Sequence, residues 1–254
     1  MLLAKKKGLV LNVTNKNSIG WAIAEAAQAH GAQVCVGAQN DKLAGKVSEL
    51  TEGRPGFSTT IVDFSDPSQL ESLRDEVARS FGTVDFIVHS AAFAQREDLS
   101  GRFIDTSREG FLLALDISAY SLVALCCALE PVIADDASVM AMSYLGSTRA
   151  VGNYNVMGVA KAALESAVRY LSVDLGQRGI RVNTVSPGPI NTVSARGVKG
   201  LSGMIESVHE RAPLKRPFGA EEVAGTCVYL MSDLSRGVTG QIVFVDDGFN
   251  ILGM

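Results

Sequence analysis

The sequence is poor in residues that hold metals or build disulfide scaffolds. Its 254 residues include only four cysteines and three histidines. The cysteines form no CxxC pair and three of them lie in apolar runs, which is typical of buried free thiols in a reducing cytosol. Because the histidines show no ligand spacing relative to the cysteines, the sequence argues against a zinc site. These residues are Cys35, Cys126, Cys127, Cys227, His30, His89 and His209. We therefore expect a cytoplasmic protein that binds no metal.

The sequence also lacks a basic excess and a long apolar segment. The formal net charge is -4, so nothing recommends nucleic acid or an anionic membrane as a partner. No stretch approaches the roughly 18 consecutive apolar residues of a spanning helix. The N-terminal lysines precede a short apolar run that ends at Asn12, which favours the start of a buried strand over a signal peptide. With 47% apolar residues, the chain can bury the core of one α/β domain.

Apolar runs and helical patterns alternate from one end of the chain to the other. The expected strands cover residues 8–13, 33–37, 57–64, 84–90, 138–143, 180–186 and 241–247. The expected helices cover residues 20–30, 41–50, 67–81, 107–129, 153–175 and 221–231. The strands are near-continuous apolar runs, which is typical of strands that are covered on both faces. The sequence therefore predicts a doubly wound α/β fold of the Rossmann type, with a seven-stranded parallel sheet in one domain over residues 1–254.

The first strand leads into a polar turn that is a candidate for binding a dinucleotide, because ligands of this fold lie at the carboxyl ends of the strands. The turn runs from Asn12 to Gly20 and contains no GxGxxG motif. It is rich in Asn, which tolerates left-handed dihedral angles. It also offers Ser18 and backbone N–H groups at a helix N-terminus, where a pyrophosphate is stabilised. A polar loop that binds nothing is the alternative interpretation of this turn.

The ends of the next three strands supply further candidate contacts. The second strand leads into Gln39, which can hydrogen-bond a ribose, although neither the acidic residue typical of NAD binding nor the Arg typical of NADP binding is present. Lys42 lies close enough to approach a 2′-phosphate, but we favour NADH over NADPH. Asp63 suits either the adenine amino group or the cap of the following helix. The small residues from Ser90 to Ala92 let a cofactor pass close to the backbone.

Two polar residues follow the fifth strand on one helix face. Tyr154 and Lys161 are seven residues apart, which places them two turns and about 10.5 Å apart along a helix. An ammonium near a phenol favours the phenolate and lowers the pKa of the phenol, which makes it a better proton donor to an oxyanion. Taken alone, the pair also fits a surface lysine and a half-buried tyrosine. Its position after the fifth strand of a dinucleotide-binding fold favours the catalytic interpretation.

The segment SYLGSTRAVGNYNVMGVAKAALE, residues 143–165, resembles the active-site segment of bacterial enoyl-acyl-carrier-protein reductases of the FabI type. This family is a branch of the short-chain dehydrogenase/reductase superfamily. The resemblance extends along the chain through SIGWAIA, QNDKL, HSAAFA, SPGPINT and SDLSRGVTGQIVFVDDGFNILG. The specific element is Tyr-x6-Lys, because ordinary members of the superfamily use Tyr-x3-Lys and that lysine position is Gly158 here.

The resemblance implies NADH-dependent reduction of the trans-2 double bond of enoyl-acyl-carrier-protein thioesters in bacterial type II fatty acid synthesis. It implies an acyl carrier protein as partner and a homotetramer. Tyr154 would donate a hydrogen bond to the substrate oxygen, Lys161 would bind the nicotinamide ribose, and Tyr144 would line the acyl pocket together with Ala94. The implied cofactor contacts, besides Lys161, are Asn12, Ser18, Ile19, Gln39, Asp63, Phe64, Ser90, Ala91, Ile190, Asn191, Thr192, Val193 and Ser194.

The wider tyrosine–lysine spacing has a chemical rationale. In carbonyl reduction, the oxygen that receives the proton is bonded to the carbon that receives hydride. In enoyl thioester reduction, hydride goes to the β-carbon and charge develops on the more distant thioester oxygen. A hydroxyl farther from the nicotinamide is then needed to stabilise that charge. Two departures from the family pattern concern the cofactor: Asn12 stands where Gly is usual, and Ala91-Ala92 where Ile-Gly is common.

Residues 187–219 are too long for an ordinary connection and read as irregular with a weak helical pattern. Long segments of this kind are often lids, and the resemblance implies a flap over the acyl chain. Five basic and two acidic residues from 189 to 219 leave +3, so an acidic carrier protein could dock there. A solvated loop is the alternative. For the whole chain, two other functions stay open: a carbonyl or alcohol oxidoreductase of the same superfamily, and a catalytically silent NAD-binding module.

Overall fold

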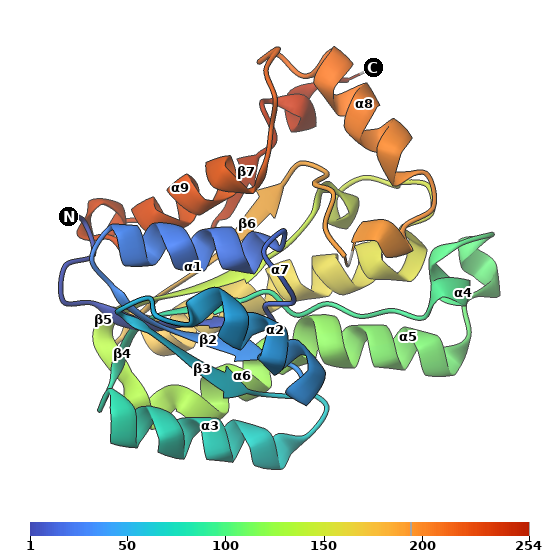
Figure 1. The fold of residues 1–254 in the computed structure, drawn as a ribbon. Coiled ribbons are helices and arrows are strands. Elements are labelled where there is room, and N and C mark those ends of the chain that lie inside the picture. Colours follow the sequence, from blue (N-terminus) through green and yellow to red (C-terminus); the bar gives the residue numbers. More distant parts are fainter. Residues whose placement is uncertain (194, 254) are drawn as a thin grey trace.

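The computed structural model of the chain describes residues 1–193 and 195–253. Its centre is a seven-stranded parallel sheet in the order β3-β2-β1-β4-β5-β6-β7, which confirms the predicted fold class (Figure 1). The strands are β1 Lys7–Leu11, β2 Gln33–Ala38, β3 Phe57–Ile61, β4 Val84–His89, β5 Ile133–Met142, β6 Arg181–Pro187 and β7 Ile242–Val245. The chain order reverses between β1 and β4. In a doubly wound sheet this switch point opens a crevice for a ligand.

Helices cover both faces of the sheet, as the apolar strands predict (Figure 1). The α-helices are α1 Ile19–Ala29, α2 Asp41–Thr51, α3 Pro67–Ser80, α4 Arg96–Leu99, α5 Arg108–Leu115, α6 Ser121–Leu129, α7 Asn155–Gly176, α8 Leu201–Arg211 and α9 Ala220–Met231. Helices α1, α2 and α9 pack on one face, and α3, α6 and α7 pack on the other.

Alternate residues of each strand supply the two halves of the core. On β1, Leu9 and Leu11 point to the face of α3, α6 and α7, whereas Val10 between them points to the face of α1 and α9. All three are fully buried. Because a strand presents successive side chains to opposite faces, a strand that is apolar at every position needs a helix on each side. The continuous apolar runs of the sequence are therefore explained by the two-sided packing.

The fifth strand begins five residues earlier than the sequence predicts. Its pairing with β4 passes from Val84–Ile133 directly to Phe86–Ser138, so the register shifts at a bulge. Asp136 lies in this bulge with a φ of 61°. The start of the strand was not predicted, because the polar residues of the bulge interrupt the apolar pattern on which the prediction depends.

The long helix expected over residues 107–129 is interrupted. Between α5 and α6, residues Asp116–Tyr120 form a π-helical turn. The turn directs the buried Ser118 onto the loop after β4, where its hydroxyl donates to the Phe93 carbonyl and accepts from the Phe93 N–H. Segments of π-helix often occur at functional sites, and this one anchors the loop that lines the cavity described below.

One helical run is long and apolar enough to cross a membrane by length and composition alone, from Arg108 to Val132. The expectation that no stretch of the chain reaches this length and apolarity is therefore wrong. The run joins α5, the π-helical turn and α6. Its side chains Leu122, Leu125 and Leu129 are fully buried in the core beneath the sheet. The apolar character of α6 thus has a structural cause, because this helix packs between α3 and α7.

Residues 187–219 are more ordered than expected, because they contain helix α8. The helix begins after Gly200, whose φ of 86° lies in the left-handed region that glycine favours. Apolar residues recur at helical spacing at Leu201, Met204 and Val208. Val208 is buried, while Leu201 and Met204 line the main cavity. The helix therefore forms one wall of the site.

Substitution of Gly8 on β1 by alanine tests the packing of β1 against β4, and the same substitution at Gly45 on α2 is the control. In Gly8→Ala, the new Cβ would lie 2.4 Å from ring carbons of the buried Phe86, so we expect a loss of about 1–3 kcal/mol. In the control Gly45→Ala, on the exposed face of α2, nothing lies within 4 Å of the new Cβ, so we expect a gain of about 0.5–1 kcal/mol. Urea unfolding followed by circular dichroism measures both, and a Gly8→Ala protein as stable as the parent would contradict the packing described.

Candidate active site

The crevice at the switch point is bridged by Asn12, which directly follows β1. Asn12 has a φ of 65°, and its side-chain amide donates to the backbone carbonyl of Ser90 at the end of β4 (3.2 Å). A second hydrogen bond across the crevice runs from the Ser90 hydroxyl to the Leu11 carbonyl (2.5 Å). Asn is among the few non-glycine residues that tolerate this left-handed conformation. The departure from Gly at position 12 is thus compatible with the turn and adds a contact across the crevice.

The turn after β1 delivers the N-terminus of α1 to the same crevice. Ser18 caps the helix, because its hydroxyl accepts from the Trp21 N–H and donates to the Asn15 carbonyl. The first N–H groups of a helix have no partner within the helix, and together with the helix dipole they suit a phosphate. Ile19 follows and lines the cavity described below. These groups fit the diphosphate of a dinucleotide.

Gln39 and Asp63 lie together at the ends of β2 and β3. The Gln39 amide is 3.5 Å from one carboxylate oxygen of Asp63, and the other oxygen accepts from the N–H and the hydroxyl of Ser65. The cap of α3 is Asp66, so Asp63 does not fill that role. The N–H of Asp63 is in turn held by the Gln69 side chain (2.7 Å). One oxygen of Asp63 and the Gln39 amide are therefore placed to meet the polar groups of an adenosine.

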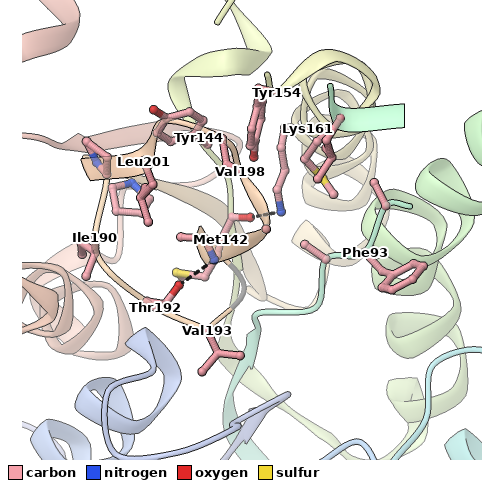
Figure 2. Close-up of a pocket in the computed structure, with 18 of the residues that line it drawn as sticks. Phe93, Met142, Tyr144, Tyr154, Lys161, Ile190, Thr192, Val193, Val198 and Leu201 are labelled. Carbon is pink, nitrogen blue, oxygen red and sulfur yellow. Dashed lines mark hydrogen bonds between the residues drawn. The ribbon is translucent and has the colours of Figure 1, made fainter. Parts of the chain in front are cut away.

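A cavity of about 660 Å³ extends from the crevice toward the start of α7 (Figure 2). It joins the ends of β4, β5 and β6 to the segment that contains α8. Its lining includes many of the residues predicted for the site: Ile19, Ser90, Ala94, Tyr144, Tyr154, Lys161, Ile190, Thr192 and Val193. Its apolar walls were not predicted from the sequence; they are formed by Phe93, Met142, Met157, Val198, Leu201 and Met204. An apolar chain fits such walls.

The remaining predicted residues lie around this cavity rather than in its lining. Ala91 is buried at the end of β4, and Phe64 packs edge-on against His89 with ring centroids 5.0 Å apart. The Asn191 side chain accepts from Arg196 (3.0 Å), and the Thr192 hydroxyl accepts from the Ala195 N–H (3.1 Å). These bonds shape the turn after β6. Ser194, also predicted to contact the cofactor, lies outside the described residues.

The two tyrosines meet at the wall of the cavity. The rings of Tyr144 and Tyr154 pack edge to face with centroids 4.8 Å apart. Gly146 lies against Tyr154 so closely that a Cβ there would be 2.4 Å from its ring, and a Cβ on Gly158 would be 2.7 Å from the Gly146 carbonyl oxygen. A side chain at position 158, where ordinary members of the superfamily carry lysine, would collide with this loop. The packing therefore leaves no room for a lysine side chain at position 158.

Burial controls the ionisation of both tyrosines. Desolvation raises the pKa of Tyr154 well above the ordinary value, and the neighbouring Tyr144 and Glu165 act in the same direction. Desolvation also raises the pKa of Tyr144. The expectation that the pKa of Tyr154 is lowered is thus wrong, because burial raises it. At neutral pH Tyr154 is a neutral hydroxyl, which can donate a hydrogen bond.

Lys161 reaches the cavity from the buried side of α7. Its ammonium donates to the Met142 carbonyl at the end of β5 (2.7 Å), and only 4% of the residue is exposed (Figure 2). Desolvation lowers the pKa of Lys161 to about 8, and the negative charge of Glu165 acts in the opposite direction. Figure 2 shows the Tyr154 hydroxyl and the Lys161 ammonium pointing into the same space. The helix thus presents one neutral donor and one cation to a ligand.

No group of three or more acidic, histidine or cysteine side chains is placed to hold a metal ion within residues 1–193 and 195–253.

The buried His89 donates through Nε2 to Ser121 (2.8 Å), because the Ser121 hydroxyl itself donates to the Ile117 carbonyl. Burial lowers the pKa of His89 to about 3, so the ring is neutral at physiological pH. Of the cysteines, Cys127 is exposed, whereas the other three are buried as expected.

Comparison with known proteins identifies the family of the chain. A family model described as enoyl-(acyl carrier protein) reductase matches residues 13–250. The chain is 44% identical to an NADH-dependent enoyl-[acyl-carrier-protein] reductase, FabI, of Bacillus cereus, over 99% of each chain. It is also 44% identical to the FabI of Nostoc sp. over 99% of each chain.

Solved structures agree in fold. The Bacillus cereus enoyl-acyl carrier protein reductase, solved with NADP+ and an indole naphthyridinone, superposes with a TM-score of 0.97 at 44% identity and covers 100% of this chain and 99% of its own. The Aquifex aeolicus enoyl-[acyl-carrier-protein] reductase (NADH) superposes with a TM-score of 0.96 at 39% identity, with full coverage of both chains. The chain therefore belongs to the enoyl-[acyl-carrier-protein] reductase family.

Proposed function

We propose that the protein uses NADH to reduce the trans-2 double bond of enoyl-acyl-carrier-protein thioesters to saturated acyl thioesters. The observation that carries this function is the pairing of a neutral Tyr154 hydroxyl with the Lys161 ammonium at one cavity. Both point into the cavity from one face of α7, with apolar walls around them. NADH supplies the hydride that adds to the β-carbon of the substrate.

The chain's own residues position the reactants and stabilise the charge that develops. Tyr154 donates a hydrogen bond to the thioester oxygen, where negative charge appears as hydride arrives. A neutral donor suits this task, because a phenolate would repel that oxygen. Lys161 binds the nicotinamide ribose, and Tyr144 packs against Tyr154 and lines the acyl pocket with Ala94.

The cofactor lies along the carboxyl ends of the strands. Ser18 and Ile19 hold the diphosphate at the N-terminus of α1, and Gln39 with Asp63 contacts the adenosine. The absence of an arginine at the end of β2 supports NADH over NADPH. Residues 190–193 contact the cofactor after β6, and residues 187–219 act as a flap over the acyl chain.

The partners follow from the same assignment. The acyl carrier protein that bears the substrate docks on the flap, where Arg216 pairs with Asp247 (3.2 Å), whereas Arg196 and Lys199 form no ion pair within the described residues. We infer a homotetramer in the cytoplasm, without a membrane or nucleic acid partner. The exposed Leu112 on α5 and the exposed Tyr170 and Val173 on α7 provide apolar surface for a second copy.

A comparison of substrates tests the reaction. We expect NADH oxidation with crotonyl-CoA, slower oxidation of NADPH, and no turnover of acetoacetyl-CoA with either cofactor, as followed by absorbance at the nicotinamide band. Turnover of the keto substrate alone would make the protein a carbonyl reductase. Cofactor binding without turnover of either substrate would make it a silent NAD-binding module.

The role of Lys161 is tested by Lys161→Ala. We expect the affinity for NADH to fall about tenfold to a hundredfold, because a charge-assisted hydrogen bond to the ribose is lost. Fluorescence titration measures it, with Arg169→Ala on the exposed face of α7 as the matched control. The parent should lose affinity as the pH rises above about 8, where Lys161 gives up its proton, while Lys161→Ala should show no such fall. Unchanged affinity in Lys161→Ala contradicts the ribose contact.

The tight packing behind Tyr154 is tested by Gly158→Ala. The added Cβ would lie 2.7 Å from the Gly146 carbonyl oxygen and must displace the loop that supports Tyr154. We expect kcat with crotonyl-CoA to fall at least about tenfold, since small misplacement of a catalytic group is costly. Gly176→Ala at the end of the same helix meets no atom within 4 Å and serves as the control. Equal kcat values for the two variants would show that the loop is not needed to place Tyr154.

A further inference from the structure

Glu165 is a buried carboxylate that the proposed mechanism does not use. It lies on α7 one turn after Lys161, and only 4% of the residue is exposed. One of its oxygens accepts a hydrogen bond from the Ser143 hydroxyl (2.5 Å). Removing a carboxylate from water is costly unless hydrogen bonds and a cation compensate. One hydrogen bond from a serine hydroxyl offsets only a small part of this cost, so other groups around Glu165 must stabilise its charge.

The nearest source of positive charge is the Lys161 ammonium. Residues four apart on a helix share a face, with Cβ atoms about 5–6 Å apart. The two side chains form no direct ion pair within 4.0 Å among the described residues: the ammonium contacts the Met142 carbonyl and the carboxylate contacts Ser143. Met142 and Ser143 are adjacent at the end of β5. The Lys161 ammonium and the Glu165 carboxylate therefore bind two consecutive residues at the end of β5. Their opposite charges also attract each other through a poorly solvated interior.

The other titratable groups around Lys161 are neutral. His89 on β4 is uncharged, because burial lowers its pKa to about 3. Tyr154 on α7 and Tyr144 after β5 are uncharged as well, because burial raises the pKa of each phenol. Within the described part of the chain, Glu165 is the charged group that opposes the effect of burial on Lys161. Its charge also favours the neutral form of Tyr154.

We propose that Glu165 is a positioning residue of the active site, which keeps the buried Lys161 ammonium protonated for cofactor binding and holds the end of β5 against α7 through Ser143. The proposal rests on the assignment of Lys161 to the nicotinamide ribose. Glu165 itself touches neither the cofactor nor the substrate in this role. Its length suits the hydrogen bond to Ser143 and its charge suits the lysine, so the two parts of the role can be separated by substitution.

The variant Glu165→Gln removes the charge and keeps the shape and an acceptor for Ser143. NADH affinity is measured by fluorescence titration from pH 6 to pH 10 in the parent, in Glu165→Gln and in the control Asp174→Asn, an exposed carboxylate on the same helix. We expect the onset of the alkaline loss of affinity, near pH 8 in the parent, to move down by at least about one pH unit in Glu165→Gln, because an opposite charge is lost. Asp174→Asn should follow the parent. An unchanged onset in Glu165→Gln overturns the proposal.

A stability measurement tests the same coupling without the cofactor. In Lys161→Met, the carboxylate of Glu165 is left buried without a cation, so adding Glu165→Gln should raise Tm. In the parent background, Glu165→Gln should lower Tm for the opposite reason. If Glu165→Gln alone does not fold, the double variant is still expected to fold and to melt above Lys161→Met. A double variant that melts at or below Lys161→Met overturns the proposal.

The two arms separate this inference from the ribose assignment. If Lys161→Met binds NADH as tightly as the parent at every pH, the ribose contact is wrong, and the melting temperatures alone decide whether Glu165 compensates the buried cation. If Lys161→Met binds weakly but Glu165→Gln keeps the pH profile of the parent, the ribose contact stands and the role of Glu165 is refuted.

Discussion

The burial of the Lys161 ammonium beneath the end of β5 is the constraint on which the rest of the site depends. A cation with 4% exposure needs an acceptor, and the structure supplies the Met142 carbonyl at 2.7 Å. That bond requires α7 to lie close to the end of the strand. The same close packing brings the ring of Tyr154, two turns before Lys161, against the ring of Tyr144, which directly follows Ser143. The positions of the Lys161 ammonium and the Tyr154 ring are thus set by one helix–strand packing.

Much of this arrangement could be predicted from residue patterns. Apolar runs without alternation predict strands covered on both faces, and the spacing of seven positions from Tyr154 to Lys161 places them on one helix face. The amphipathic pattern from Val198 to Val208 was also available, and it would have indicated α8 as a wall of the cavity. Each of these signals is local, because it depends on periodicity within one element.

Other features depend on contacts between distant segments and leave no local pattern. The π-helical turn at Asp116–Tyr120 places Ser118 to hydrogen-bond the backbone of Phe93, which is 25 residues away in the sequence. The bulge in β5 is defined by its partner strand. The direction of the Tyr154 pKa shift could not be read from the lysine alone, because burial within the assembled site is its largest cause. Sequence patterns report on each element, whereas solvation is a property of the assembled site.

The two unusual positions of the chain illustrate how backbone geometry limits side-chain choice. At position 158, a Cβ would lie 2.7 Å from the Gly146 carbonyl oxygen, so the loop behind Tyr154 leaves no room for a lysine side chain there. At position 12, a φ of 65° excludes most residues, but an asparagine meets it and uses its amide to join β1 to β4 through Ser90. In each case the local conformation comes first, and the residue that satisfies it then determines what the site can hold.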